Sequence, residues 1–224
     1  AGQHAVTWRG VDADGRAVAL HHDAQVYATS GLETSLFALL LTGGLLLVAG
    51  RRPRLDLAAV VYALAVLTRP EGALYAATAG LFILYRTRSG RATARFALLW
   101  GGLLVPWIVW KTVYYGTPIP NTYYAKSAAL PHWSQGWEYT RLYFGIYPVL
   151  LAAAAAALGG WLAARRRARP VTAGTTPARA DLVPLALVQV LLTVLYVTRV
   201  GGDFMFARFY VPVTPLLYLA AEAA

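Results

Sequence analysis

Two charged residues lie between apolar segments of this chain, where a charge is costly. Arg69 and Glu71 flank Pro70 between two short apolar stretches. Charged side chains at membrane depth are expensive and tend to be functional. Arg69 has the chemistry to bind a phosphate, and Glu71 could orient that group or act on a hydroxyl. The simpler alternative is an interfacial turn whose two charges form an ion pair.

A second polar set surrounds a pair of glycines. Asp203 follows Gly201 and Gly202 among apolar aromatic residues, with Arg199 four residues before it and Arg208 five residues after it. A carboxylate here could take a proton from a hydroxyl, or hold a sugar or a metal, and the arginines could neutralise a phosphate. The glycines would let the backbone pass close to a ligand. The structural alternative is a glycine turn in which Asp203 caps the next helix or pairs with Arg208.

The segment 114–126 is rich in tyrosine and contains two prolines. Asn121 and the neighbouring Tyr123 and Tyr124 could contact a sugar, and Lys126 could meet a phosphate. Tyrosines are equally typical of the aromatic belt at a membrane surface, and composition alone favours that interpretation.

Glu33 lies three residues after Ser30, at the start of a long apolar stretch. This spacing matches a capping box, in which the two side chains bind the first backbone amides of a helix. The capping box accounts for both residues without a ligand, and a substrate contact by Glu33 stays open.

The sequence predicts no definite cofactor, although carboxylates of this kind are compatible with a divalent metal. His21, His22 and Asp23 are adjacent, but neighbouring histidines point apart on a helix or a strand, so they predict a metal site only weakly. The sequence contains no P-loop, GxSxG or HExxH motif. It contains no cysteine, which excludes disulfides, thiolate nucleophiles and cysteine-bound zinc.

Apolar helices must position these polar groups. Hydrophobic residues make up 58% of the 224 residues and charged residues only 13%, against roughly 25% in a typical soluble domain. This composition excludes a disordered chain and argues against a soluble enzyme. The net charge of +10 would suit nucleic acid, but in so apolar a chain it is typical of cytoplasmic loops of a membrane protein. We therefore expect the lipid bilayer, and no nucleic acid, as a partner.

The hydropathy pattern predicts an all-α fold, a polytopic transmembrane helical bundle with about seven membrane segments. The two segments on either side of residues 69–71 have 14 residues each, which is short for a full span, and they predict a helical hairpin. The predicted segments are residues 32–49, 55–68, 72–85, 96–113, 142–164, 182–200 and 210–223.

The basic residues predict the orientation of this bundle. Twelve of the 20 fall in three loops on one side, within residues 51–54, 86–95 and 165–179. The positive-inside rule makes these loops cytoplasmic, and we expect them to be solvated connectors. The chain then divides into an extracytoplasmic segment, 1–31, and a transmembrane domain, 32–224, whose extracytoplasmic loops lie near 69–71, 114–141 and 200–209. We expect a fragment of a longer multi-pass membrane protein, with its site on the extracytoplasmic side.

The motifs in residues 67–72, 115–126 and 201–212 together resemble those of bacterial membrane glycosyltransferases of the GT-C class. The nearest similarity is to the actinobacterial terminal arabinofuranosyltransferases of the cell wall. The residues 30–34 match the same pattern, and the motifs follow one another in order over most of the chain.

This resemblance implies a multi-span helical fold in the bacterial plasma membrane and a donor sugar carried on a polyprenyl phosphate. It also implies inverting transfer, in which a carboxylate deprotonates the acceptor hydroxyl and basic residues stabilise the departing lipid phosphate. Such enzymes usually carry the catalytic acidic residue in their first outer loop, which we expect this fragment to lack. Asp203, Glu71 and Arg69 would then support that residue.

The predicted function is transfer of a sugar, arabinofuranose or a hexose, from a polyprenyl-phosphate donor to an extracytoplasmic glycan, lipid or protein. Arg69, Lys126 and Arg208 would bind the donor phosphate, with Asp203 and Glu71 directed at a hydroxyl or orienting the site. One alternative is a flippase for lipid-linked sugars, which the scarcity of polar residues such as Gln189 within the spans disfavours. Another is a non-catalytic membrane scaffold.

Overall fold

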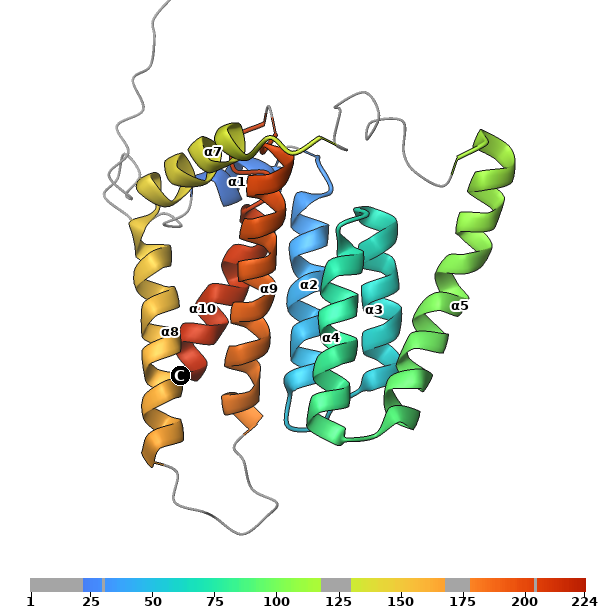
Figure 1. Cartoon of the computed structure of the whole chain (residues 1–224), viewed down its shortest axis with the longest axis horizontal. Helices are drawn as coiled ribbons and strands as arrows, with labels where there is room; N and C mark the ends of the chain where they lie inside the picture. The colour runs from blue at the N-terminus through green and yellow to red at the C-terminus, as the bar shows by residue number, and fades with distance from the viewer. Residues whose placement is uncertain (1–21, 30, 118–129, 168–177, 204) are drawn as a thin grey trace, which may run out of the picture.

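The computed structural model describes residues 22–29, 31–117, 130–167, 178–203 and 205–224. All regular secondary structure in these residues is helical, which confirms the predicted all-α fold (Figure 1). The helices are α1 (His22–Thr29), α2 (Thr34–Ala49), α3 (Leu55–Thr68), α4 (Gly72–Thr87), α5 (Gly90–Tyr115), α7 (Trp133–Ile146), α8 (Pro148–Arg167), α9 (Ala178–Val200), the short 3-10 helix η1 (Val211–Val213) and α10 (Thr214–Ala223).

Several of these helices have the length and composition of membrane spans. Among the described residues, three qualify fully: Gly90–Tyr115, Pro148–Arg166 and Asp181–Val200. Three shorter apolar helices, Thr34–Ala49, Leu55–Thr68 and Val211–Ala223, accompany them. The outward faces of the long helices are apolar, as at Leu98 and Val113 of α5, which are 75% and 82% exposed. These faces suit a bilayer, and the count of seven segments stays a prediction.

Two predicted boundaries were wrong. The segment predicted at 142–164 is divided at Tyr147, because Pro148 has no backbone N–H to continue the preceding helix. The first part belongs to α7, which runs across one end of the bundle rather than along it (Figure 1). The segment predicted from residue 96 begins at Gly90, since the Ser89 hydroxyl accepts a hydrogen bond from the amide of Ala92 and starts α5 earlier.

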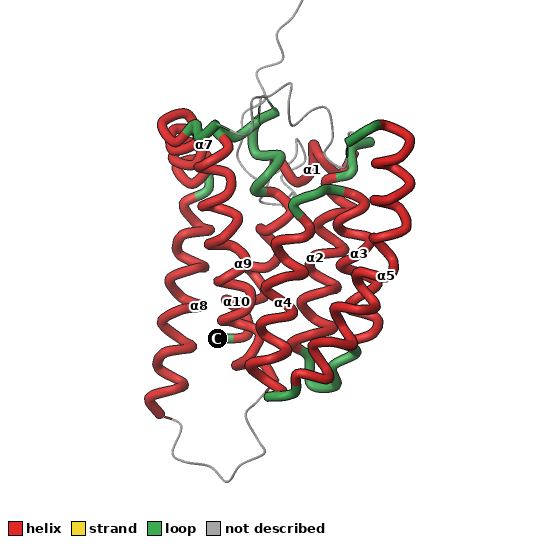
Figure 2. Tube along the Cα trace, turned by 45° about the vertical axis from the view of Figure 1, so that its right-hand side comes forward, coloured by secondary structure: helices red, strands yellow, loops and turns green. Residues whose placement is uncertain are grey.

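The helices pack in two neighbouring groups. Helices α2, α3, α4 and α5 lie side by side, and α9 joins them to α8 and α10 (Figures 1 and 2). Helix α2 packs tightly on α3 at Gly44, where an added Cβ would stand 2.7 Å from the Tyr62 ring. Gly44 therefore lets the fully buried Tyr62 fill the space between these helices. The neighbouring Gly43 has open space around it.

This difference between adjacent glycines gives a matched test of the packing. Gly44→Ala is expected to destabilise the protein by about 1–3 kcal/mol, because the Tyr62 ring must move out of its buried position. Gly43→Ala is expected to be neutral or stabilising by up to about 1 kcal/mol, because alanine is the better helix former. Thermal unfolding midpoints in one detergent compare the two variants, and equal midpoints would contradict the α2–α3 packing.

The connections alternate between the two ends of the bundle. The α3–α4 turn, α1 and α7 lie at one end, and the α2–α3 and α4–α5 connections lie at the other (Figures 1 and 2). At this second end Arg86 is not the solvated connector residue we expected. Its guanidinium donates to the carbonyls of Val48 and Gly50 at 3.0 and 3.3 Å and lies 3.4 Å from Asp181. Arg86 thereby caps the carboxyl end of α2 and ties it to α9.

Candidate functional site

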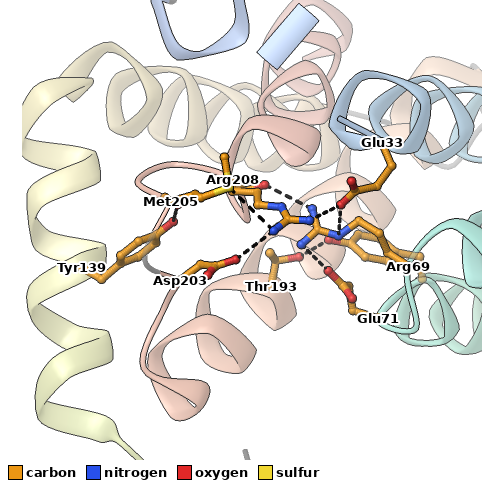
Figure 3. A network of polar contacts seen from close by, with 9 residues as sticks. Glu33, Arg69, Glu71, Tyr139, Thr193, Asp203, Met205 and Arg208 are labelled. Carbon is orange, nitrogen blue, oxygen red and sulfur yellow. Dashed lines mark hydrogen bonds and ion pairs between the residues drawn. The ribbon is translucent and has the colours of Figure 1, made fainter. Parts of the chain in front are cut away.

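Five charged residues from three distant segments meet at the end of the bundle that holds the α3–α4 turn (Figure 3). We call them the charged cluster. Glu33 directly precedes α2, Arg69 and Glu71 form the α3–α4 turn, and Asp203 and Arg208 lie between α9 and η1. The structure thus places six of the ten residues predicted for the site within the described segments, and it brings five of those six together.

Arg69 is buried at the centre of the charged cluster and is only 6% exposed. Its guanidinium lies over the rings of Phe37 and Phe209, with its central carbon 5.2 and 4.8 Å from their centroids. Its Nη1 donates to the backbone carbonyl of Arg208 at 3.2 Å. Its Nη2 lies 2.6 Å from Glu71 Oε1 and forms an ion pair with it. These contacts hold the guanidinium plane in one orientation.

The tight α3–α4 turn places Arg69 and Glu71 at this position. Pro70 cannot continue α3, and Gly72 starts α4 where an added Cβ would stand 2.7 Å from the backbone of Ala65. Only a residue without a side chain can pass so close to α3. The turn therefore brings two helix ends together with their charges side by side.

Glu33 bridges the two arginines of the charged cluster. Its Oε1 accepts a hydrogen bond from Arg208 Nη2 at 2.5 Å and lies 3.9 Å from Arg69 Nε. Helix α2 starts at Thr34 with Glu33 as its N-cap residue, so Glu33 does not hold the third helical position that the predicted capping box requires. Burial opposes ionisation of Glu33, but the hydrogen bond and the charge of Arg208 outweigh it and lower the pKa of this carboxyl. Glu33 is therefore ionised at neutral pH.

Asp203 reaches Arg208 from the opposite side to Glu33. Its carboxylate lies 3.4 Å from Arg208 Nη1, and its side chain is only 2% exposed. The preceding Gly201 and Gly202 have φ values of +95° and +82°, in the left-handed region that favours glycine. An added Cβ at Gly202 would stand 2.6 Å from the ring of Tyr139. The paired glycines let the chain approach α7, and their predicted approach to a ligand stays a prediction.

The charged cluster is not an open basic site. Two arginines face three carboxylates, so its net formal charge is −1 when all five groups are ionised. The Nε of Arg208 is buried and has no hydrogen-bond partner among the described residues. The cluster thus holds an unused donor, but an anion would have to displace a carboxylate to bind both arginines.

The remaining predicted site residues divide into two groups. Arg199 is exposed at the end of α9, and no described contact joins its guanidinium to the charged cluster. Asn121, Tyr123, Tyr124 and Lys126 lie outside the described residues.

In the described part of the chain, no group of three or more His, Cys, Asp or Glu side chains could hold a metal ion. Asp23 accepts a hydrogen bond from the Tyr147 hydroxyl at 2.8 Å, and His21 is outside the described residues.

Several supporting residues were missed by sequence reasoning. The rings of Phe37 and Phe209 both contact the Arg69 guanidinium. The Tyr27 hydroxyl donates a hydrogen bond to the carbonyl of Phe206 at 2.6 Å. Burial raises the pKa of Tyr27, so its hydroxyl stays protonated for this bond. Below the cluster, the hydroxyls of Tyr75 and Thr193 lie 2.5 Å apart and join α4 to α9. The sequence did offer one indication of Phe37 and Tyr75. Each follows an acidic residue of the charged cluster, Glu33 or Glu71, by four positions, which places the two side chains on the same face of a helix.

Two curated relatives match most of this sequence. A terminal beta-(1->2)-arabinofuranosyltransferase from Corynebacterium glutamicum is 32% identical over 214 residues, which cover 83% of this chain. A protein of the same name from Mycobacterium tuberculosis is 36% identical over 224 residues, which cover 88% of this chain. This chain is homologous to actinobacterial terminal arabinofuranosyltransferases. The resemblance seen in its motifs is thereby confirmed.

This homology covers a part of each arabinofuranosyltransferase. The chain spans about a third of the length of the curated relatives it matches, 31% of one and 35% of the other. No family model matches the sequence, and no solved structure matches it. The arabinofuranosyltransferase relatives are glycosyltransferases by name.

Proposed function

We propose that this chain forms part of a membrane glycosyltransferase of the GT-C class. The enzyme moves a sugar, arabinofuranose or a hexose, from a polyprenyl-phosphate donor to an extracytoplasmic glycan, lipid or protein. The observation that carries this proposal is the charged cluster at one end of an apolar helical bundle homologous to arabinofuranosyltransferases. The basic loops at the opposite end support a plasma-membrane orientation with the cluster on the extracytoplasmic side.

The proposed reaction is an inverting displacement. The acceptor hydroxyl oxygen forms a bond to the anomeric carbon of the sugar as the bond from that carbon to the phosphate oxygen breaks. The bonding electron pair leaves with the polyprenyl phosphate, and the hydroxyl proton passes to a carboxylate. Guanidinium groups held in place before the reaction stabilise the charge that develops on the phosphate.

The arginines of the charged cluster are the proposed phosphate ligands, and its three carboxylates have different proposed roles. Arg69 and Arg208 share one anionic partner, Glu33, which is the most exposed carboxylate of the cluster at 29%. We infer that the donor phosphate takes the place of the Glu33 carboxylate between them. The burial of Asp203 supports an orienting role toward Arg208, and the ion pair of Glu71 supports the same role toward Arg69. Lys126 and the neighbouring Asn121, Tyr123 and Tyr124 remain proposed contacts to phosphate and sugar.

Removing the charge of Glu33 tests this exchange. Glu33→Gln is expected to tighten donor binding by roughly three- to tenfold, because the phosphate no longer competes with an anionic partner of both arginines. The dissociation constant of the donor, measured by titration of the intact protein, gives the result directly. A matched control is Glu138→Gln, which breaks an exposed ion pair with Arg141 on α7 and should leave this constant unchanged. Weaker donor binding in Glu33→Gln would show that Glu33 instead positions the arginines.

An apolar groove on the helical bundle supports the proposal that the donor is lipid-linked. It has a volume of about 960 Å³ and lies between α7, α8, α9 and α10, with Phe144, Leu151, Val190 and Leu217 in its walls. Such a groove can hold the isoprenoid tail of a donor along α8 and α9.

The flippase alternative needs a polar path through the membrane. The most buried polar side chain of α9 is Gln189, which donates to Thr78 at 3.2 Å and to the Tyr62 hydroxyl at 3.4 Å. Both bonds hold α9 against α3 and α4. These described polar groups therefore serve helix packing, which disfavours their use as a path for a sugar.

A transfer assay separates the three candidate functions. The intact protein in proteoliposomes is given arabinofuranosyl or hexosyl polyprenyl phosphate together with an oligosaccharide acceptor. A glycosyltransferase releases polyprenyl phosphate and an extended acceptor in equal amounts. Translocation of the donor with its sugar–phosphate bond intact would identify a flippase, and neither event would favour a scaffold.

A further inference from the structure

A second charged site lies at the opposite end of the bundle from the charged cluster. Arg54 precedes α3, and Arg91 and Arg95 lie in the first two turns of α5. Together with Asp56 they line a pocket of about 620 Å³ between these two neighbouring helices. We call this the basic pocket.

The basic pocket has more arginines than carboxylates in its walls, so its positive charge is only partly neutralised. Arg95 pairs with Asp56 at 2.6 Å, but Arg54 and Arg91 form no ion pair with the described residues. Three guanidinium groups against one carboxylate leave a net formal charge of +2. This is the reverse of the charged cluster, where the carboxylates are in excess.

The two helix ends add to this positive potential. The first turns of α3 and α5 both line the basic pocket, so the positive ends of two helix dipoles point toward it. Helix α5 has a side-chain cap, since Ser89 accepts from Ala92. Helix α3 has Arg54 as its N-cap without a side-chain cap hydrogen bond, and Asp56, the acidic residue of its first turn, is already paired with Arg95. A basic residue at a helix N-terminus is electrostatically unfavourable unless an anion is nearby.

An exposed apolar surface continues from the basic pocket toward the middle of the bundle. On α3, Leu57 and Leu64 are 44% and 46% exposed, and on α5, Leu98 is 75% exposed one turn beyond Arg95. An anionic head beside exposed leucines along the helices is the arrangement that a phospholipid complements. A free phosphate would leave this apolar surface unused.

We propose that the basic pocket binds the phosphate of an anionic phospholipid, whose acyl chains lie along α3 and α5. Arg54 and Arg91 bind the phosphate oxygens, and Arg95 is held by Asp56 at the edge of the pocket. The site is separate from the charged cluster and does not depend on the proposed transfer reaction. The partner is one anionic lipid of the adjoining leaflet.

Native mass spectrometry of the intact protein tests this assignment with phosphatidylglycerol and, as a neutral-headgroup probe, phosphatidylcholine. The double variant R54Q/R91Q is expected to bind phosphatidylglycerol roughly 25-fold more weakly, since each arginine near an anionic lipid contributes about fivefold. The control R51Q/R52Q removes the same charge from the same end outside the pocket, and it should bind as the unmodified protein does. If the double variant does not fold, the single exposed substitution R91E should weaken binding in the same direction.

Three outcomes would overturn the proposal. Equal losses in the two double variants would show attraction to overall charge rather than a site. Unchanged binding in R54Q/R91Q, or equal binding of phosphatidylcholine, would remove the basic pocket as a headgroup site. Full displacement of phosphatidylglycerol by millimolar inorganic phosphate would assign the pocket to a free anion.

Discussion

Replacing Arg69 with alanine is expected to reduce sugar transfer strongly and to destabilise the protein. The substitution leaves Glu33 and Glu71 without one of their cationic partners in a largely buried position, which costs about 3 kcal/mol or more. Loss of a phosphate ligand is expected to lower kcat/KM by roughly 100-fold or more. Turnover of polyprenyl-phosphate sugar and the thermal unfolding midpoint measure the two effects separately.

Arg69→Lys distinguishes the functional effect from the structural one. Lysine keeps the positive charge between the carboxylates, so most of the stability should return. It lacks the planar fork that packs on the rings of Phe37 and Phe209, so transfer should stay strongly reduced. If Arg69→Lys restores turnover together with stability, Arg69 acts only as a structural cation.

Asp203→Asn is expected to raise KM for the donor, because Asp203 holds Arg208 in position. The amide keeps the shape of the side chain but removes the charge that holds Arg208 Nη1 at 3.4 Å. We expect KM for the donor to rise by roughly 10- to 100-fold, the size of a lost hydrogen bond to a charged group. The fall in kcat should be smaller, because the proposed role of Asp203 is to orient a phosphate ligand without touching the reacting atoms.

Glu138→Gln is the matched control for Asp203→Asn. It removes one carboxylate at the same end of the bundle, from an exposed pair with Arg141 at 2.8 Å, and its kinetics should match those of the unmodified protein. A large loss of kcat with unchanged KM in Asp203→Asn would instead assign proton removal to Asp203. Unmodified kinetics in both variants would remove Asp203 from the site.

Much of the fold could be predicted from hydropathy. The helices α2, α3 and α10 lie within a few residues of their predicted segments because apolar runs and Gly or Pro interruptions determine helix ends directly. The division between α7 and α8 was missed because the apolar pattern continues across Tyr147. Pro148 was the available signal, since proline is common at the start of a helix and ends the one before it.

The charged cluster was harder to predict, because its parts are distant in the sequence. Local pairing of Arg69 with Glu71 and of Asp203 with Arg208 was foreseen as the structural alternative for each motif. The bridge from Glu33 to Arg208 joins residues 175 positions apart, and no local pattern indicates it. The excess of carboxylates over arginines was equally hidden, because it depends on which charges meet. The roles of these residues in sugar transfer stay predictions.

A structure of the intact protein with a non-transferable phosphonate analogue of the polyprenyl-phosphate sugar tests the central claim most directly. The account predicts the phosphonate between Arg69 and Arg208, within hydrogen-bond distance of both guanidinium groups, with the Glu33 carboxylate withdrawn from Arg208. An analogue bound elsewhere, with Glu33 still bridging the two arginines, would contradict it.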